Sequence, residues 1–110
     1  MPVSLSINEA VARMGDKALY LKIASAFAAA LPETLVSLEQ AIAPENLPNA
    51  RRFAHSLKSN CAAIGAVEIQ AMASALEKAC AAGDLSRAVL EFSRLKPHLY
   101  ELRETLFSLV

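Results

Sequence analysis

The feature that most constrains the fold is a set of apolar stripes, in which large apolar residues recur every three or four positions. The clearest stripe consists of seven residues near the C-terminus: Leu85, Val89, Phe92, Leu95, Leu99, Leu102 and Leu106. This spacing places the side chains on one face of an α-helix. No segment alternates apolar and polar residues with the period of two that indicates a half-buried strand. The sequence therefore predicts an all-α protein.

Five segments of the chain carry a helical pattern, and glycine or proline residues separate them. The expected helices run from about Ser6 to Met14, Tyr20 to Ile42, Leu47 to Ile64, Ile69 to Cys80 and Leu85 to Leu106. Long amphipathic helices with short connections bury their apolar faces most simply as an antiparallel up-down bundle. We therefore expect a single domain over residues 1–110, a four-helix bundle with a short additional N-terminal helix.

Particular residues indicate where these helices bend, start and stop. The segment Pro44 to Pro48 is expected to be a loop that leads into the first turn of the third helix. Gly65 is expected to end that helix, and Asp84 to cap the last one. Pro32 lies inside the second helical pattern and is expected to kink or split that helix, and Pro97 is expected to bend the last helix.

Composition argues against several classes of function. The eleven basic and eleven acidic residues cancel, so we expect no face for nucleic acid or for an anionic membrane. The longest apolar stretches, such as the one around Ala24 to Leu31, are far too short to cross a bilayer, and no secretory signal is visible. Cys61 and Cys80 lie on apolar stripes and make no disulfide framework. These features indicate a cytoplasmic domain without a nucleic-acid or membrane partner.

The third expected helix has an unusual outward face. Its inward face is expected to consist of Phe53, Ala54, Leu57, Cys61 and Ile64. The opposite side then carries Arg51, Arg52, His55, Lys58, Ser59 and Ala62. A histidine thus lies between two arginines one turn before it and a lysine one turn after it, and the side chains beyond it are small.

Such a face suits the transfer of a phosphoryl group through imidazole. Neutral imidazole is a nucleophile near pH 7, because its unperturbed pKa is about 6.5. The phosphoramidate product is a dianion, which Lys58, Arg51 and Arg52 would stabilise by charge attraction and hydrogen bonding. The chain offers no phosphate-binding loop and no acidic metal cluster, so a partner must supply them. We expect neither a metal nor a cofactor in this domain.

Less specific interpretations of the two histidines stay open at this point. A surface histidine flanked by basic residues is ordinarily part of a solvated helix face. His98 could in principle pair with His55 around a metal ion, but we expect too few ligands for such a site. His98 is expected to be a solvated residue of the last helix.

The run from Ala54 to Ala66, AHSLKSNCAAIGA, resembles the signature of the histidine-containing phosphotransfer (HPt) family. In that family an Ala-His-x-Leu-Lys-Gly run is followed by small residues and an Ile-Gly-Ala helix end. The likeness covers nearly the whole chain, including Gly15-Asp16, Phe27, Leu76-Glu77 and Gly83-Asp84. By this resemblance His55 is the phosphorylated histidine and Lys58 stabilises the phosphate. Ser59 stands where most members have glycine, which keeps the position small.

The resemblance implies a phosphocarrier that has no kinase activity and no ATP site. His55 would accept a phosphoryl group from the aspartate of a receiver domain and pass it to another response regulator, and a hybrid sensor histidine kinase is a further implied partner. Arg51, Arg52, Ser59 and Ala62 are the expected docking residues. The alternative is a helical protein-interaction module of HPt-like fold that is not phosphorylated. Such a module would be expected to lose His55 or Lys58, and this chain keeps both.

Overall fold

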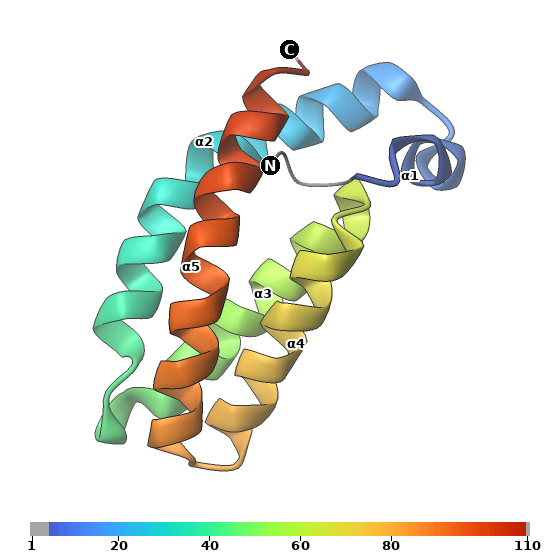
Figure 1. The fold of residues 1–110 in the computed structure, drawn as a ribbon. Helices are drawn as coiled ribbons and strands as arrows, with labels where there is room; N and C mark the ends of the chain where they lie inside the picture. The colour runs from blue at the N-terminus through green and yellow to red at the C-terminus, as the bar shows by residue number, and fades with distance from the viewer. Residues whose placement is uncertain (1–4, 110) are drawn as a thin grey trace.

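The protein is an antiparallel helical bundle in the computed structural model, which describes residues 5–109 (Figure 1). Its elements are α1 (Ile7–Met14), α2 (Lys17–Ala41), the 3-10 turn η1 (Pro44–Asn46), α3 (Leu47–Ile64), α4 (Val67–Ala81) and α5 (Leu85–Phe107). Residues 5–109 contain no strand. The all-α prediction is confirmed, and the bounds of the third helix are those expected from Pro48 and Gly65.

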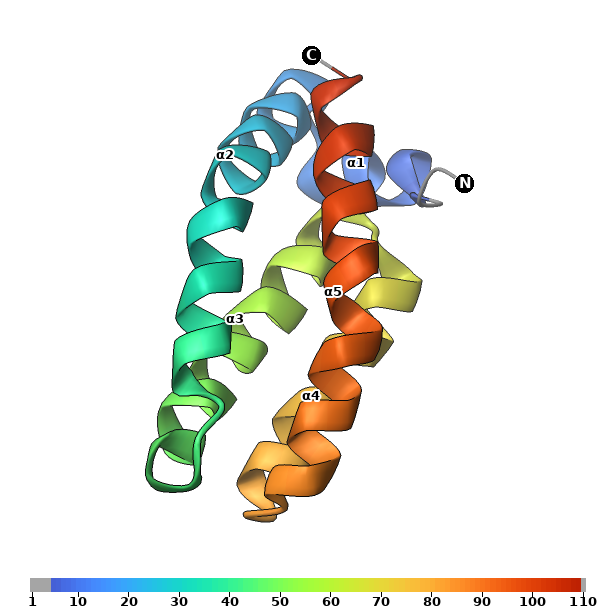
Figure 2. The same ribbon diagram turned by 60° about the vertical axis from the view of Figure 1, so that its left-hand side comes forward.

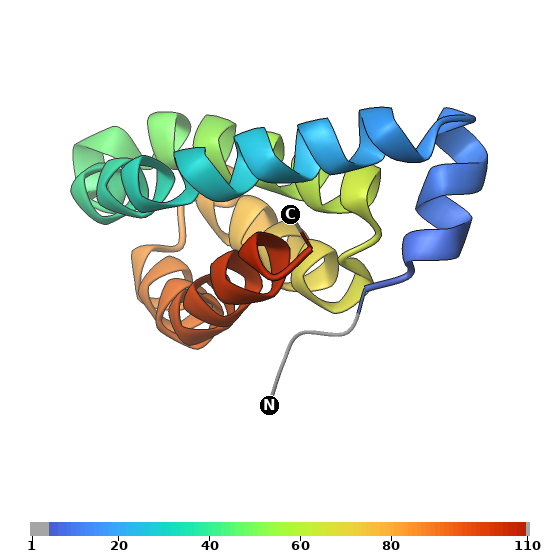
Figure 3. The ribbon, with the colours of Figure 1, turned by 90° about the horizontal axis from the view of Figure 1, so that it is seen from above.

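Four long helices alternate in direction and form the body of the bundle. Helices α2 and α4 run one way and α3 and α5 the other (Figures 1 and 2). Each helix packs against its neighbour in sequence, and α2 also packs against α5, which closes the bundle. The short helix α1 lies across one end, beside the turn between α3 and α4 (Figure 3). This is the predicted up-down topology with one additional N-terminal helix.

The helix ends explain why the chain turns where it does. The Asp84 carboxylate accepts a hydrogen bond from the Arg87 backbone N–H at 3.0 Å and caps α5, as predicted. Gly65 ends α3 with a φ of 82°, a left-handed conformation that favours glycine. A Cβ atom at this position would also lie 2.7 Å from the Ser6 carbonyl oxygen. Only glycine therefore allows the α3–α4 turn and the segment before α1 to approach so closely.

Neither proline divides its helix, so of the two outcomes expected at Pro32, a kink or a split, the split does not occur. Both α2 and α5 continue without a break through Pro32 and Pro97. Both proline rings are exposed, so each lies on the outer side of its helix and leaves the apolar stripe that faces the core intact. The predicted loop from Pro44 to Pro48 is likewise largely helical, because η1 leads directly into α3.

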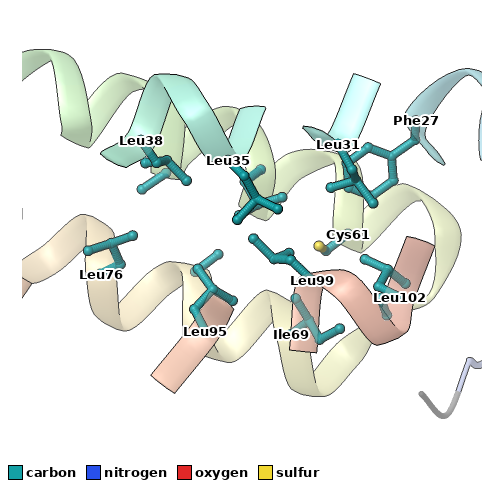
Figure 4. Packing of buried hydrophobic residues seen from close by; sticks show 14 of the residues in the cluster. Phe27, Leu31, Leu35, Leu38, Cys61, Ile69, Leu76, Leu95, Leu99 and Leu102 are labelled. Carbon is teal, nitrogen blue, oxygen red and sulfur yellow. The ribbon is translucent and has the colours of Figure 1, made fainter. Parts of the chain in front are cut away.

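Apolar side chains from the four long helices meet in one core (Figure 4). Leu31, Leu57, Leu76 and Leu99 are at most 1% exposed and come from α2, α3, α4 and α5 in turn. Full burial of such a side chain contributes about 1.5–3 kcal/mol, so the closed bundle holds the outer faces of its helices in fixed positions.

Two residues assigned to the core by their spacing are exposed instead. Phe53 is 39% exposed because it lies at the edge of the α3 stripe, beside a hollow that Ser37 and Ala41 of α2 also line. Val89 is 51% exposed. Near it, the inward side of α5 is occupied by Glu91, whose carboxylate is paired with the flanking Arg87 and Arg94 at 2.9 and 3.5 Å. The predictions that Phe53 and Val89 point inward are therefore wrong.

One helix within residues 5–109, α2, is long and apolar enough to cross a bilayer by length and composition alone. The sequence prediction considered only the short apolar stretch around Ala24 to Leu31. The whole helix is longer and carries few charged residues, so it meets the length and composition expected of a membrane span. Eight residues of α2 are buried in the bundle core. A core helix passes the same criterion, so this is weak evidence for a span, and the absence of a membrane partner stays a prediction.

Candidate functional site

The outward face of α3 carries the predicted site residues on the solvent side of the bundle. His55, Arg51, Arg52 and Ser59 are exposed, while Lys58 and Ala62 are half-buried. The buried Ala54 and Leu57 lie beside His55 in sequence and hold this stretch of α3 against the core. The histidine is therefore presented to solvent from a rigid mid-helix position.

A carboxylate from α4 holds both His55 and Lys58. The Nδ1 atom of His55 lies 2.7 Å from Oε2 of Glu77, and Nζ of Lys58 donates to Oε1 of the same carboxylate at 2.5 Å. The Glu77 side chain is 14% exposed, whereas that of His55 is 59% exposed. The ring is thus fixed on its inner edge and open on its outer edge.

The ionisation of Glu77 determines which ring nitrogen is free. The hydrogen bond from Lys58 is the main reason that the pKa of Glu77 is lowered, and the hydrogen bond from His55 acts in the same direction against a partial desolvation. An ionised carboxylate only accepts hydrogen bonds, so Nδ1 of neutral His55 must carry the proton and donate it. The lone pair of the neutral ring is then on Nε2, which is the nitrogen that faces solvent.

An open hollow of about 420 Å³ adjoins the imidazole on the side of the two arginines. Arg51, Arg52, Ser56 and Glu77 line it together with His55. Arg52 donates a hydrogen bond from Nη1 to Oδ1 of Asn49 at 3.3 Å, which ties one guanidinium to its own helix. Two guanidinium groups, a hydroxyl and the Glu77 carboxylate therefore border a space large enough for a phosphoryl group.

On the other side of His55 the side chains of α3 are small, so no bulky group stands beside the ring there. Ser59 and Ala62 border a second hollow of about 420 Å³ that reaches α1 and the start of α4. The Ala62 carbonyl accepts a hydrogen bond from Nη2 of Arg13 at 2.9 Å. The structure thus brings all six predicted site residues onto one surface and adds a residue of α1 to it.

The described residues outside this surface include a second histidine and two cysteines. No group of three or more His, Cys, Asp or Glu side chains within residues 5–109 could hold a metal ion. Nδ1 of His98 lies 4.0 Å from a carboxylate oxygen of Glu101 on α5. Cys61 and Cys80 are free, buried thiols, and burial raises the pKa of Cys61 to about 12.

The family model of the Hpt domain matches residues 22–105, which covers most of the chain and all of α3 and α4. The chain belongs to the Hpt domain family. Hpt domains are helical bundles that serve as phosphocarriers in phosphorelays and interact with receiver domains and histidine kinases of two-component systems. Searches of curated proteins and of solved structures found no match to this Hpt domain.

Sequence reasoning placed the outward residues of α3 but gave no role to Glu77 or Arg13. Glu77 follows Leu76 in the pair that entered the family resemblance, yet a contact between helices depends on how far one helix is displaced along the other. No local pattern reports that displacement. One signal was present, since Glu77 directly follows the buried Leu76 and can therefore lie at the edge of the buried stripe of α4.

Proposed function

We propose that this Hpt domain accepts a phosphoryl group on Nε2 of His55 from the aspartate of a receiver domain and passes it to the aspartate of a second receiver. In the first step the Nε2 lone pair attacks phosphorus. The bond between phosphorus and the aspartyl oxygen breaks, and its electron pair returns to the carboxylate. The second step is the reverse, with the electron pair of the P–N bond returning to Nε2. The receiver brings its own metal ion and acidic residues.

The observation that carries the proposal is the contact between His55 and Glu77. Because Nδ1–H donates to Glu77, the ring does not rotate freely and its Nε2 lone pair points outward. A nucleophile held in one orientation needs little further ordering when the partner arrives. A solvated surface histidine would show no such fixed contact with a largely buried carboxylate on another helix.

Lys58 is proposed to stabilise the phosphoryl group from one helical turn away. In the unphosphorylated protein its ammonium group is held by Glu77, so it lies beside the ring before a phosphoryl group arrives. Arg51 and Arg52 supply further positive charge at the opposite side of the ring. Stabilising the dianion in this way requires charge and position but no metal ion in the Hpt domain itself.

We propose that a receiver domain docks on the small side chains around Ser59 and Ala62, and that Arg51 and Arg52 form the basic end of the same surface. Receiver domains must bring an aspartate within bonding distance of Nε2, so bulky side chains beside the ring would block the approach. Exposed Ala26 on α2, which packs against α3, is small and apolar and fits the rim of such a contact.

The test is to incubate the chain with a phosphorylated receiver domain and to follow label that is labile to acid and stable to base. We expect label on His55, and we expect His55→Gln to abolish it while the thermal melting curve is retained. His98→Gln is the matched control and should accept label at the wild-type rate. Label that persists in His55→Gln would contradict the assignment, and no label on wild type would favour the unphosphorylated interaction module.

A further inference from the structure

Helix α1 forms one wall of a pocket that adjoins the surface around His55. The pocket is lined from α1 by Glu9 and Arg13, from the end of α3 by Ser59, Ala62 and Ala63, and from α4 by Val67 and Gln70. Ser6 and Gly65 complete the lining. Its volume is about 420 Å³, equal to that of the hollow on the arginine side of the histidine. Residues 7–14 lie outside the segment that the family model matches.

Three contacts fix α1 in this position. The Ser6 backbone N–H donates to the Gly65 carbonyl at 2.9 Å, and Arg13 donates to the Ala62 carbonyl at the same distance. Ala10 is completely buried between α1 and the bundle. The pocket wall is thus attached to the helix that carries His55, and it is formed before any partner binds.

The pocket lies within the area that a docked protein must cover. Ser59 is four residues beyond His55 and Ala62 is seven, which corresponds to about 6 and 10 Å along the helix axis. An interface of standard size buries about 800 Å² on each partner, a patch of roughly 16 Å radius when it is circular. A receiver domain centred on Nε2 of His55 therefore extends over α1.

The groups at the edge of the pocket differ from those at the arginine side. Among the side chains that the structure describes, none forms an ion pair with Glu9 or Arg13, and the one hydrogen bond of Arg13 goes to a neutral carbonyl, so neither charge is neutralised before a partner binds. Val67, the first residue of α4, is 57% exposed and adds an apolar side chain to the same pocket. This surface is mixed in charge, whereas the surface at Arg51 and Arg52 is basic.

We propose that α1 is a specificity element, which selects among receiver domains through the pocket between Glu9, Arg13 and Val67. This inference rests on the proposed function. Its occupant is a receiver domain whose surface beside the phosphorylated aspartate is apolar, with a basic group facing Glu9 and an acidic group facing Arg13. Selection here acts on binding and leaves the reacting atoms unchanged.

The test compares transfer kinetics from a phosphorylated receiver domain, chosen from a panel as the one that labels the wild-type chain fastest. Ala63→Trp fills the pocket from an exposed position, and we expect it to raise KM about tenfold with little change in kcat. Glu9→Lys should raise KM about three- to fivefold at low salt, an effect that shrinks as salt screens the charge. The Glu9→Lys variant should then be labelled fastest by a different receiver of the panel.

Matched controls make the same changes away from the pocket. Glu104→Lys reverses an exposed charge on α5, and Ala82→Trp adds an indole at the exposed end of α4. Both should keep the wild-type KM. Wild-type KM in Ala63→Trp and Glu9→Lys, with His55 still labelled, would overturn the role of α1 and leave the proposed function standing. No label on the wild-type chain would overturn both.

Discussion

Replacing Glu77 by alanine tests how much the imidazole depends on the carboxylate behind it. Hydrogen bonds to charged groups contribute about 1.5–3 kcal/mol, and the exposure of the His55 side chain, 59%, places this bond at the lower end of the range. At about 1.4 kcal/mol for each factor of ten, we expect Glu77→Ala to slow phosphotransfer about tenfold. Glu77→Gln keeps a neutral acceptor of about half the strength, so it should slow transfer about threefold.

The assay is single-turnover transfer from a phosphorylated receiver, measured by rapid quench, together with nitrogen NMR of the imidazole. We expect neutral His55 of the wild type to carry its proton on Nδ1. In Glu77→Ala we expect the neutral ring to exchange between two tautomers, one protonated on Nδ1 and the other on Nε2. Stability should change by no more than about 1 kcal/mol, because the contacts of Glu77 reach the surface. Glu68→Ala, at an exposed position of α4, is the control. Equal transfer rates for wild type and Glu77→Ala would refute the positioning role.

The remaining predictions concern charge, shape and pH. Lys58→Ala should slow transfer more than Arg51→Ala or Arg52→Ala, with melting temperatures nearly unchanged. Equal transfer rates for wild type and Lys58→Ala would show that this charged face is ordinary solvated surface. Ser59→Glu and Ala62→Arg should block transfer in the same assay, whereas Ser59→Gly should be tolerated; wild-type rates in both blocking variants would place docking elsewhere. The pKa of buried Cys61 is about 12, against an ordinary value of 9.0, so only the unfolded state ionises between these values. Stability measured by denaturant titration should therefore fall above pH 9, by up to about 1.4 kcal/mol per pH unit, and should fall less steeply in Cys61→Ala.

Much of the fold follows from local signals in the sequence. The bounds of α3 were predictable because Pro48 fits a first turn and Gly65 fits a left-handed helix end. The exposure of His55 followed from the stripe on the opposite side of the same helix. These features depend on residues within a few positions of each other, which is the range over which helical periodicity is informative.

The errors and omissions involve relations between helices. Phe53 lies at the edge of its stripe, and its burial depends on whether α2 covers it, which the periodicity of α3 does not report. Glu91 takes an inward position on α5 because Arg87 and Arg94 neutralise it, an exception to the rule that charged residues face outward. Glu77 and Arg13 reach the site from other helices, so only the packed bundle shows their contacts.

The rates at which the two buried thiols are chemically modified report how often each part of the bundle opens. Cys61 lies on the inner side of the helix that carries His55, and Cys80 lies near the end of α4, at the opposite end of the bundle from α1. A thiol-alkylating reagent can modify either one only when its part of the bundle opens. The ratio of the two modification rates, read by mass spectrometry, therefore reports which end of the bundle loosens first. A bound receiver that clamps the α1 end would slow the reaction of Cys61 more than that of Cys80.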